Sequence, residues 1–275
     1  MGYDTAGCSS FEKDSWETKV VPILSYLSHL MMKEPRSISS LYEDNDFLVI
    51  NKPAGLVVHS DGKRKEESVV DWIKAERPEV CEVGEPLRLS TGEMIERSGI
   101  VHRLDKETSG VLIIAKNQKA YEHLKSQFKN RSVEKIYNAF AQGSFKDESG
   151  EIDFPIGRSA RDFRRRAVKG TRGETREALT LYKVLVNGRE ASFLEIFPKT
   201  GRNHQIRVHM KAVNHPIICD KLYSPKAQCI LGFRRLALHA RSIKFKDQSG
   251  DEINIEAPLP EDFEEALEKI KGLPN

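Results

Sequence analysis

The apolar run Val111-Leu112-Ile113-Ile114-Ala115 constrains the fold of this chain more than any other feature. Its apolar character is continuous, whereas a strand with one face in water alternates between apolar and polar residues. We therefore expect a central strand that is buried on both faces. The polar segment directly before it, residues 102–110, would then be a loop that leads into the core.

Shorter patterns on both sides of this run predict a mixture of helices and strands. Ser68 and Asn117 precede apolar residues at helical spacing, so each is a predicted helix cap, and the first helix should end before Pro78. A polar loop at residues 78–98 and a final helix from Glu261 to Lys271 are also expected. Strands are expected at residues 47–50, 56–59, 100–101 and 133–141, and near 177–186, 190–197, 234–239, 241–246 and 252–257. Because these elements do not alternate as β-α-β units, the sequence predicts an α+β fold around a largely antiparallel, mixed β-sheet.

Composition limits the class of protein. Of the 275 residues, 39% are hydrophobic and 31% are charged, which suits a folded chain with a sizeable core. The formal net charge of +3 does not by itself indicate nucleic-acid binding, so that signal must come from how the charge is distributed. The apolar stretch from Val20 to Met32 contains Pro22 and His29 and is too short to cross a bilayer, so we expect neither a signal peptide nor a membrane role.

The cysteines and histidines do not indicate a metal site. Cys8, Cys81, Cys219 and Cys229 are far apart without close Cys or His partners, which favours reduced thiols in a cytoplasmic protein over zinc or a disulfide framework. His204 and His209 are five positions apart, whereas a spacing of four brings two ligands onto one helix face. We therefore expect no metal and interpret both histidines as structural.

Asp105, in the loop before the apolar run, is the candidate catalytic side chain. It lies between two cations, Arg103 and Lys106, and a positive partner within reach favours an ionised carboxylate. An ionised aspartate can act as a nucleophile without a cofactor. On the residues alone, however, a structural role is favoured, either as a loop cap or in a surface ion pair.

The longer segment Gly99-Ile100-Val101-His102-Arg103-Leu104-Asp105-Lys106-Glu107-Thr108-Ser109-Gly110-Val111-Leu112 closely resembles the active-site motif of the RluA-type RNA pseudouridine synthases. The likeness extends, in the order of the family, to residues 51–59, 155–158, 200–209 and 236–240. It implies a pseudouridine synthase fold of two lobes with flanking helices and an active-site cleft. Residues 39–275 would be the catalytic domain. Such an enzyme flips a uridine out of RNA, breaks the bond from N1 to C1′ and rejoins the uracil through C5, without a cofactor.

The resemblance also implies roles for individual residues. Asp105 would be the essential carboxylate, and it would act on C1′, on the uracil ring or on a ribose proton. Arg207 would pair with Asp105, and Tyr137 would pack against the target base. Arg103 would enter the RNA stack in place of the flipped nucleotide, with an ordinary ion pair as the alternative. The expected structural residues of the site are His102, Leu104, Thr108 and Leu238.

Two histidines and two segments complete the expected site. His102 and His239 should hold backbone groups by hydrogen bonds, and a general-base histidine is the weaker alternative. A helix capped by Asn203 should carry Arg207 near its start, with a strand as the second choice. Residues 158–176 are strongly basic and include Gly residues and Phe163, which favours a mobile loop that grips phosphates over a merely solvated surface. The expected RNA contacts are Arg103, Arg158, Arg164, Arg165, Arg166 and Arg202.

This chain departs from the family pattern in three places. Residues 1–38 form an extension that is too short for the RNA-binding domain of many members, Cys219-Asp220-Lys221 stands where a Gly-Asp start is common, and the loop at 78–98 is longer than usual. The expected substrate is structured RNA, large-subunit ribosomal RNA first and transfer RNA second, bound by a monomer. The main alternative is a non-catalytic RNA-binding or ribosome-assembly protein on the same fold, which loss of Asp105 or Arg207 would favour. A generic hydrolase is disfavoured because no nucleophile elbow accompanies the acid.

Overall fold

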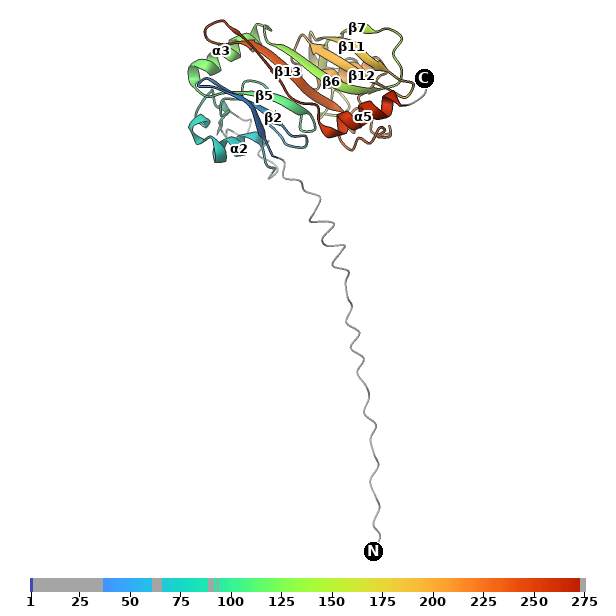
Figure 1. The fold of residues 1–275 in the computed structure, drawn as a ribbon, viewed down its shortest axis with the longest axis horizontal. Coiled ribbons are helices and arrows are strands. Elements are labelled where there is room, and N and C mark those ends of the chain that lie inside the picture. The colour runs from blue at the N-terminus through green and yellow to red at the C-terminus, as the bar shows by residue number, and fades with distance from the viewer. Residues whose placement is uncertain (2–36, 61–65, 89–91, 93, 273–275) are drawn as a thin grey trace. The chain divides into compact units, whose positions relative to one another are not determined.

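A nine-stranded sheet forms the centre of the structure (Figure 1). The computed structural model describes Met1 and residues 37–60, 66–88, 92 and 94–272. In chain order the elements are β1 (Ser39–Glu43), β2 (Phe47–Lys52), α2 (Val69–Glu76), the 3-10 helix η1 (Pro78–Val80), β3 (Leu87–Arg88), β4 (Met94–Ile95), β5 (Ser109–Ala115), α3 (Gln118–Lys129), β6 (Glu134–Gln142), β7 (Ser149–Asp153), β8 (Ile156–Ser159), β9 (Arg166–Ala167), β10 (Thr171–Arg176), β11 (Leu179–Asn187), β12 (Ala191–Pro198), α4 (Gln205–Ala212), β13 (Leu238–Lys246), β14 (Glu252–Glu256) and α5 (Glu261–Lys271). This mixture of a large sheet and a few helices confirms the predicted α+β class.

The large sheet has the strand order β1-β2-β5-β13-β6-β12-β11-β7, and β14 pairs with β13. Among the strands described in it, β5 and β13 pair in parallel and the other pairs are antiparallel. Every residue of β5 is buried, which confirms the predicted central strand. Gly110 allows the close approach of β13, because a Cβ at this position would lie 2.1 Å from the carbonyl oxygen of Ala240 and its φ is 109°.

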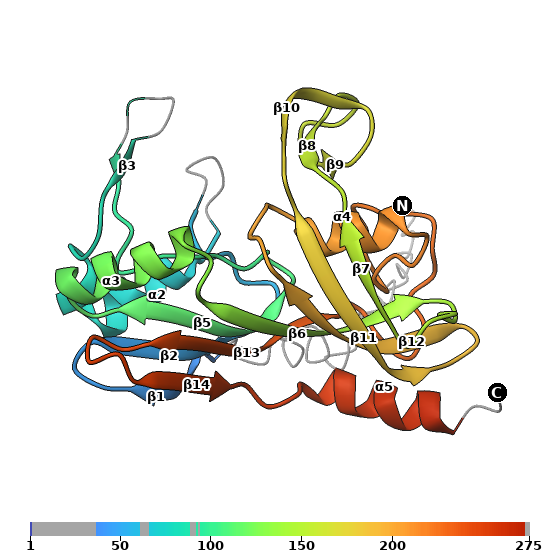
Figure 2. The same ribbon diagram turned by 90° about the horizontal axis from the view of Figure 1, so that it is seen from above.

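Two large hydrophobic clusters fill the two halves of the sheet. The first gathers side chains of β2, β5, α2 and α3, and the second gathers those of β6, β12, α4 and α5. Figure 2 shows α2 and α3 on one side of the sheet and α5 along the opposite side. Tyr137 on β6 packs against both clusters, so it lies where the two lobes of the fold meet.

Three of the predicted helices begin or end as their sequence signals indicate. Ser68 and Asp71 form a capping box at the start of α2, in which each side chain accepts the N–H of the other residue. Asn117 Oδ1 accepts the N–H of Ala120 at 2.9 Å at the start of α3. The last helix, α5, has the predicted bounds.

The start of α4 differs from its prediction. The helix begins at Gln205 and ends at Ala212, and the prediction that Asn203 caps it is wrong. His204, directly before the helix, has a left-handed backbone with φ of 56° and makes no side-chain capping hydrogen bond. A side-chain cap needs an extended backbone at that position, and the turn at residues 203–204 does not supply it.

Several predicted strands change in length because a strand depends on its partners as well as on its own sequence. Residues 56–59 and 100–101 are reduced to single bridges, which join Val57 to Ser68 and Ile100 to Ile114. The two strands predicted near 234–239 and 241–246 are one strand, β13, with an irregularity between Ala240 and Ser242. Residues 234–237 lie outside it, in the preceding loop.

The basic segment at residues 158–176 is not a loop throughout, which corrects its prediction. It provides most of a three-stranded sheet in which β8 pairs with both β10 and β9. Figure 2 shows this sheet projecting from the large one. Most of β10 is exposed, so its sequence carries no apolar alternation from which a strand could be predicted.

The predicted extension, residues 1–38, lies almost wholly outside the described residues. Its lack of an RNA-binding domain therefore stays a prediction. The first described strand begins at Ser39, where the predicted catalytic domain begins. In the part of the chain that the structure describes, no helix has the length and apolar character needed to cross a membrane.

Candidate active site

The loop that carries Asp105 is fastened by a buried lysine. Lys52, at the end of β2, is fully buried. Its ammonium donates to the carbonyl oxygens of Pro53 at 2.8 Å and Leu56 at 2.9 Å, and also to that of Lys106 at 3.2 Å. A buried charge is costly unless hydrogen bonds compensate for it. The three carbonyls stabilise the buried ammonium, and the ammonium in turn fixes the positions of the three carbonyls. Lys52 thus links the segments at residues 51–59 and 99–112, and together they position the loop that carries Asp105.

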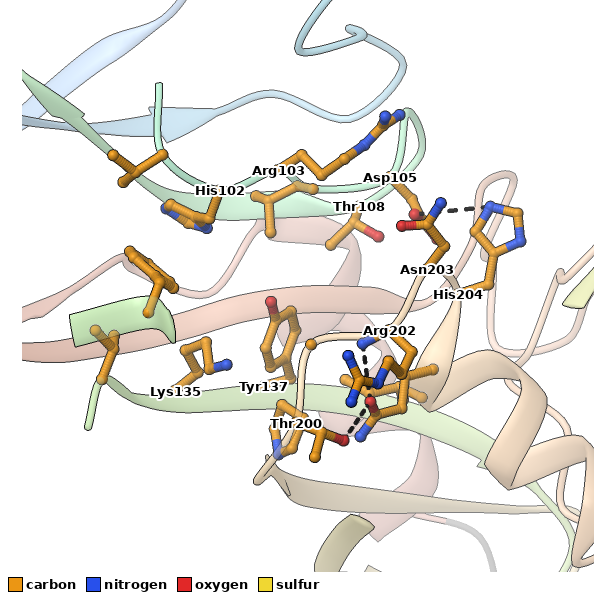
Figure 3. A pocket seen from close by; sticks show the side chains of 18 of the residues that line it. His102, Arg103, Asp105, Thr108, Lys135, Tyr137, Thr200, Arg202, Asn203 and His204 are labelled. Atoms are coloured by element: carbon orange, nitrogen blue, oxygen red, sulfur yellow. Dashed lines mark hydrogen bonds and ion pairs between the residues drawn. The ribbon is translucent and has the colours of Figure 1, made fainter. Parts of the chain in front are cut away.

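His102 and Thr108 shape the same loop from its two ends. The N–H of Ile113 donates to His102 Nε2 at 3.0 Å, and burial lowers the pKa of His102 to about 3, so its ring is a neutral acceptor. The N–H of Thr108 donates to the carbonyl of Asp105 at 3.1 Å and closes a turn. Thr108 lines the pocket described below, and its buried hydroxyl has no hydrogen-bond partner among the described residues (Figure 3). Leu104 is buried beside them.

Arg207 on α4 joins two aspartates from different segments. Its Nη1 donates to Asp105 Oδ2 at 2.8 Å, and its Nε and Nη2 donate to the two carboxylate oxygens of Asp220, each at 2.8 Å. The exposed fractions of the side chains are 11% for Arg207, 23% for Asp105 and 1% for Asp220. Burial acts to lower the pKa of Arg207, but the hydrogen bonds and charges of both aspartates outweigh it and raise that pKa. Arg207 is therefore a permanent cation held in a fixed orientation.

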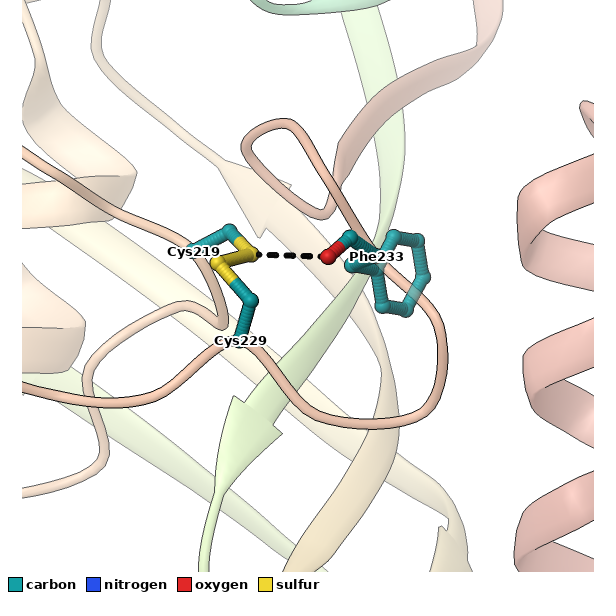
Figure 4. The surroundings of a disulfide bond; sticks show 3 residues. All are labelled: Cys219, Cys229 and Phe233. Carbon is teal, nitrogen blue, oxygen red and sulfur yellow. Dashed lines mark hydrogen bonds between the residues drawn. A yellow bond between two sulfur atoms is a disulfide. The ribbon is translucent and has the colours of Figure 1, made fainter.

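The loop after α4 contains a disulfide next to Asp220 (Figure 4). Cys219 and Cys229 form this bond, which corrects the expectation that all cysteines are reduced thiols. They are ten positions apart, and the loop between them folds back until their Cα atoms are 4.8 Å apart, a proximity that spacing in the sequence does not reveal. Cys81 is a free thiol, and Cys8 lies outside the described residues.

A pocket of about 870 Å³ lies in front of Asp105. Asp105 is the one carboxylate among the described residues that line it. The other charged side chains of the lining are the cations Arg97, Arg103, Lys129, Arg131, Lys135, Lys199, Arg202 and Arg207. Such a pocket suits a polyanion whose reacting atoms must meet a single acid.

Tyr137 and Leu238 contribute to the pocket from neighbouring strands. Tyr137 pairs with Ala240 of β13 on one side and with Ile196 of β12 on the other, so its position is set by the middle of the sheet. Burial and the charge of Asp105 both raise the pKa of Tyr137, which keeps it a neutral phenol. Leu238 is buried at the start of β13.

The predicted RNA-contact arginines are divided between the pocket and the small sheet. Arg103 and Arg202 line the pocket, and Figure 3 shows the Arg103 side chain extending away from Tyr137. Within the described residues no acid forms an ion pair with Arg103. The remaining predicted contacts lie on or beside β8 and β9, outside the pocket lining: Arg158, Arg164, Arg165 and Arg166. Of these, Arg164 and Arg165 pair with Asp162.

Two histidines that are predicted to be structural, His239 and His204, differ in their position relative to the pocket. His239 is buried outside the pocket lining, where its Nδ1 lies 2.9 Å from Ser109 Oγ. His204 lines the pocket, with its Nδ1 3.0 Å from the Tyr223 hydroxyl and its Nε2 3.9 Å from Asp105 Oδ1. Burial lowers the pKa of His204, so the contact with Asp105 is not an ion pair at neutral pH.

Sequence reasoning also missed Gln205 and Asp220. Gln205 Oε1 accepts hydrogen bonds from Thr200 Oγ1 at 2.7 Å and from the N–H of Arg202 at 3.0 Å, and its Nε2 donates to β11. It thereby anchors the loop that leads into α4. The resemblance gave a signal at both positions, because Gln205 lies in the family block at residues 200–209 and Asp220 is the aspartate of the family's Gly-Asp start, but it gave no role for either. In the part of the chain described, no group of three His, Cys, Asp or Glu side chains could hold a metal ion.

Comparison with known proteins gives this arrangement a family. The model of the RNA pseudouridylate synthase family matches residues 46–212. The uncharacterized RNA pseudouridine synthase YlyB of Bacillus subtilis is 37% identical over 242 residues, which cover 88% of this chain and 75% of that protein. Ribosomal large subunit pseudouridine synthase D of Neisseria meningitidis serogroup B is also 37% identical, over 86% of this chain and 62% of its own length.

Solved structures agree with this assignment. Human RNA pseudouridylate synthase domain containing 4 superposes with a TM-score of 0.65 and 26% identity, covering 86% of this chain and 95% of its own. Human RNA pseudouridylate synthase domain containing 1 has the same fold, with a TM-score of 0.65 and 24% identity. The chain belongs to the RNA pseudouridylate synthase family, and it is an enzyme that isomerises uridine in RNA. The alternative of a non-catalytic protein on the same fold is not favoured.

Proposed function

We propose that Asp105 is the carboxylate that acts on the target uridine, that Arg207 holds it in place, and that Tyr137 supports the base. The observation that carries this proposal is the 2.8 Å hydrogen bond from Arg207 Nη1 to Asp105, in a pocket where Asp105 is the single carboxylate among the described lining residues. A carboxylate that reacts with a nucleotide must keep one orientation, although several other cations lie close enough to attract it. The hydrogen bond to the fixed Arg207 guanidinium keeps that orientation.

The chemistry of the pocket suits a base that detaches and turns. The bond between N1 and C1′ breaks, the uracil rotates, and a bond between C5 and C1′ forms. C5 then releases its hydrogen as a proton to the solvent and the freed N1 takes one up, so the product is an isomer of the substrate. Tyr137 offers a flat, neutral surface that can hold uracil in more than one orientation. The surrounding lysines and arginines can bind the phosphates on either side of a flipped nucleotide.

We infer that large-subunit ribosomal RNA is the first substrate to test and transfer RNA the second. The name of the Neisseria relative supports this order. Arg103 is exposed at the rim of the pocket, which suits a side chain that replaces the flipped nucleotide in its stack. The arginines of the β8–β10 sheet would bind phosphates further along the RNA. We also propose that the enzyme acts as a monomer in the cytoplasm. The disulfide removes reduced thiols as a reason for this location, and the ribosomal large subunit in the name of the Neisseria relative supports it. Size-exclusion chromatography and cell fractionation would test the two proposals.

Tritium release from RNA labelled at uridine C5 is the direct assay, because the C5 hydrogen leaves when pseudouridine forms. Unmodified large-subunit ribosomal RNA and transfer RNA transcripts serve as parallel substrates, with protein treated with a chelator. We expect wild-type protein to release tritium from the ribosomal transcript and Asp105→Asn to release none above background. Asp262→Asn is the matched control, because Asp262 also pairs with an arginine, Arg235, but lies outside the pocket lining.

The proposal fails if Asp105→Asn converts uridine at a rate close to that of wild-type protein. Release from transfer RNA alone would replace the inferred substrate while leaving the role of Asp105 intact. Mapping pseudouridines at nucleotide resolution in cells with and without the gene would then identify the modified positions.

A further inference from the structure

Asp220 is a buried acid next to the pocket that none of the roles above requires. It lies in the loop after α4, and its side chain is 1% exposed. Both of its carboxylate oxygens accept hydrogen bonds from Arg207, to Nε and to Nη2, each at 2.8 Å. A carboxylate and a guanidinium that meet through two parallel hydrogen bonds fix the plane of the guanidinium as well as its position.

The third nitrogen of the guanidinium is the one that reaches Asp105. Once Asp220 fixes Nε and Nη2, the direction of Nη1 is determined, and Nη1 donates to Asp105 Oδ2 at 2.8 Å. We propose that Asp220 is a positioning residue for the reaction, which orients Arg207 so that Arg207 can orient Asp105. This inference rests on the proposed role of Asp105.

The loop around Asp220 is built to keep that carboxylate still. Asp220 Oδ1 also accepts the N–H groups of Leu222 at 3.1 Å and Tyr223 at 3.0 Å. The backbone N–H of Asp220 donates to Ile217, and its carbonyl accepts from Ser224. The residue before it, Cys219, is tied into the disulfide. An acid with only a charge-balancing role would need none of these constraints on its direction.

The ring of Tyr223 completes the enclosure of Arg207. The Arg207 guanidinium carbon lies 5.1 Å from the centre of this ring, within the range of a cation–π contact. Arg207 therefore has Asp220 along one edge and an aromatic ring nearby, and it has one free direction, toward Asp105. In the series Asp220, Arg207, Asp105, the buried Asp220 and its loop provide the fixed support, and the partly exposed Asp105 is the residue that is positioned.

Asp220→Asn is the sharpest substitution because of how the hydrogen bonds are divided. Asparagine keeps Oδ1, which accepts from Arg207 Nη2 and from the two backbone N–H groups. It replaces Oδ2, which accepts from Arg207 Nε, with an amide group that can only donate. The turn of the loop and the hydrogen bond from Nη2 are thus retained, while the hydrogen bond from Nε is lost, and with it the pairing that fixes the plane of the guanidinium.

The experiment is a double-mutant cycle on single-turnover and steady-state tritium release from large-subunit ribosomal RNA transcript. Asp220→Asn is measured in the wild-type protein and in Arg207→Lys, a background that keeps the charge but loses the planar guanidinium. In the wild-type background we expect kcat to fall about 10- to 100-fold with KM within about 3-fold, since misplacement of a catalytic group acts on the chemical step. In the Arg207→Lys background the further fall should be within about 3-fold.

Two controls separate this inference from the function on which it rests. Asp262→Asn, which removes a similar paired carboxylate on α5, should leave kcat unchanged. Circular dichroism must show that each variant is folded. If Asp105→Asn keeps full activity, the proposed function fails. If Asp105→Asn is inactive while Asp220→Asn leaves kcat within about 2-fold, changes only KM, or lowers kcat by equal factors in both backgrounds, the positioning role of Asp220 is wrong.

Discussion

Replacing Arg207 with glutamine is expected to lower the free energy of unfolding by about 4 kcal/mol, because it leaves a buried carboxylate unpaired. Asp220, with its side chain 1% exposed, would lose two charge-assisted hydrogen bonds of 2.8 Å. Each such bond contributes about 1.5–3 kcal/mol, so the loss at Asp220 is about 3–6 kcal/mol. The two backbone N–H groups that remain on Oδ1 place the expected value in the lower part of this range. The loss at Asp105 adds little, since its side chain is 23% exposed and water can replace the bond.

Urea denaturation at neutral pH, monitored by circular dichroism, gives the free energy of unfolding of each variant by linear extrapolation. The double variant Arg207→Gln with Asp220→Asn should recover about half of the loss, because it removes the unpaired charge and leaves two amides that can bond to each other. Arg235→Gln is the matched control. Its partner Asp262 is 30% exposed, so a loss of about 1 kcal/mol is expected there.

Two results would refute this reasoning. If Arg207→Gln costs no more than Arg235→Gln, burial of Asp220 does not make the pair important for stability. Alternatively, adding Asp220→Asn to Arg207→Gln could destabilise the protein further, which would mean that the aspartate is held mainly by its own loop and not by the arginine.

Three further predictions concern other parts of the molecule. Thr108→Val should leave the free energy of unfolding unchanged or raise it by about 1 kcal/mol, since the buried hydroxyl has no hydrogen-bond partner among the described residues and its loss of hydration is not compensated; urea denaturation measures the effect, and a loss of more than about 1 kcal/mol would contradict the reasoning. Phe163 is 89% exposed in the turn between β8 and β9, so Phe163→Ala should raise KM about 5-fold or more with kcat unchanged if the ring stacks on a base, whereas Leu185→Ala, at 43% exposed, should not. Burial lowers the pKa of His239 from 6.5 to about 3, so the unfolded state binds a proton at this residue before the folded state does, and the free energy of unfolding falls as the pH drops from 6.5 toward 3. His239→Gln should therefore reduce the loss of unfolding free energy between pH 7 and 5 by about 2 kcal/mol. If the free energy of unfolding depends on pH in the same way in this variant, the lowered pKa is wrong.

The parts of the fold that follow from neighbours in the sequence could be predicted. The continuous apolar run of β5 required a strand buried on both faces, and Ser68 and Asn117 are caps because each side chain bonds to a backbone group three residues away. The parts that depend on distant partners could not. β13 is one strand because β6 and β5 pair along it, and Cys219 meets Cys229 because of how the loop between them folds back.

The same distinction explains what was missed in the site. The resemblance supplied Asp105, Arg207 and Tyr137 one at a time, each on its own block of sequence. The role of Asp220 could not be predicted from its place in the family's Gly-Asp start, because the carboxylate meets Arg207 only when α4 and the following loop are folded. His204 was interpreted as structural for a similar reason, since its left-handed backbone, which directs the ring toward Asp105, cannot be seen in the sequence.

The arrangement of charge accounts for how one pocket can both attract RNA and present an acid to it. A free carboxylate would repel the phosphates of the substrate. Arg207 neutralises Asp105 at short range, and the second acid that holds Arg207, Asp220, is buried where its charge does not face the pocket opening. Apart from Asp105, the charged side chains among the described residues that line the pocket are cations. Because Asp105 comes from the half of the fold built on β5 while Arg207 and Asp220 come from the half that contains α4, the ion pair also joins the two lobes at the point where Tyr137 lies between their cores. A change that loosens the packing of either lobe should therefore lower activity before it unfolds the protein.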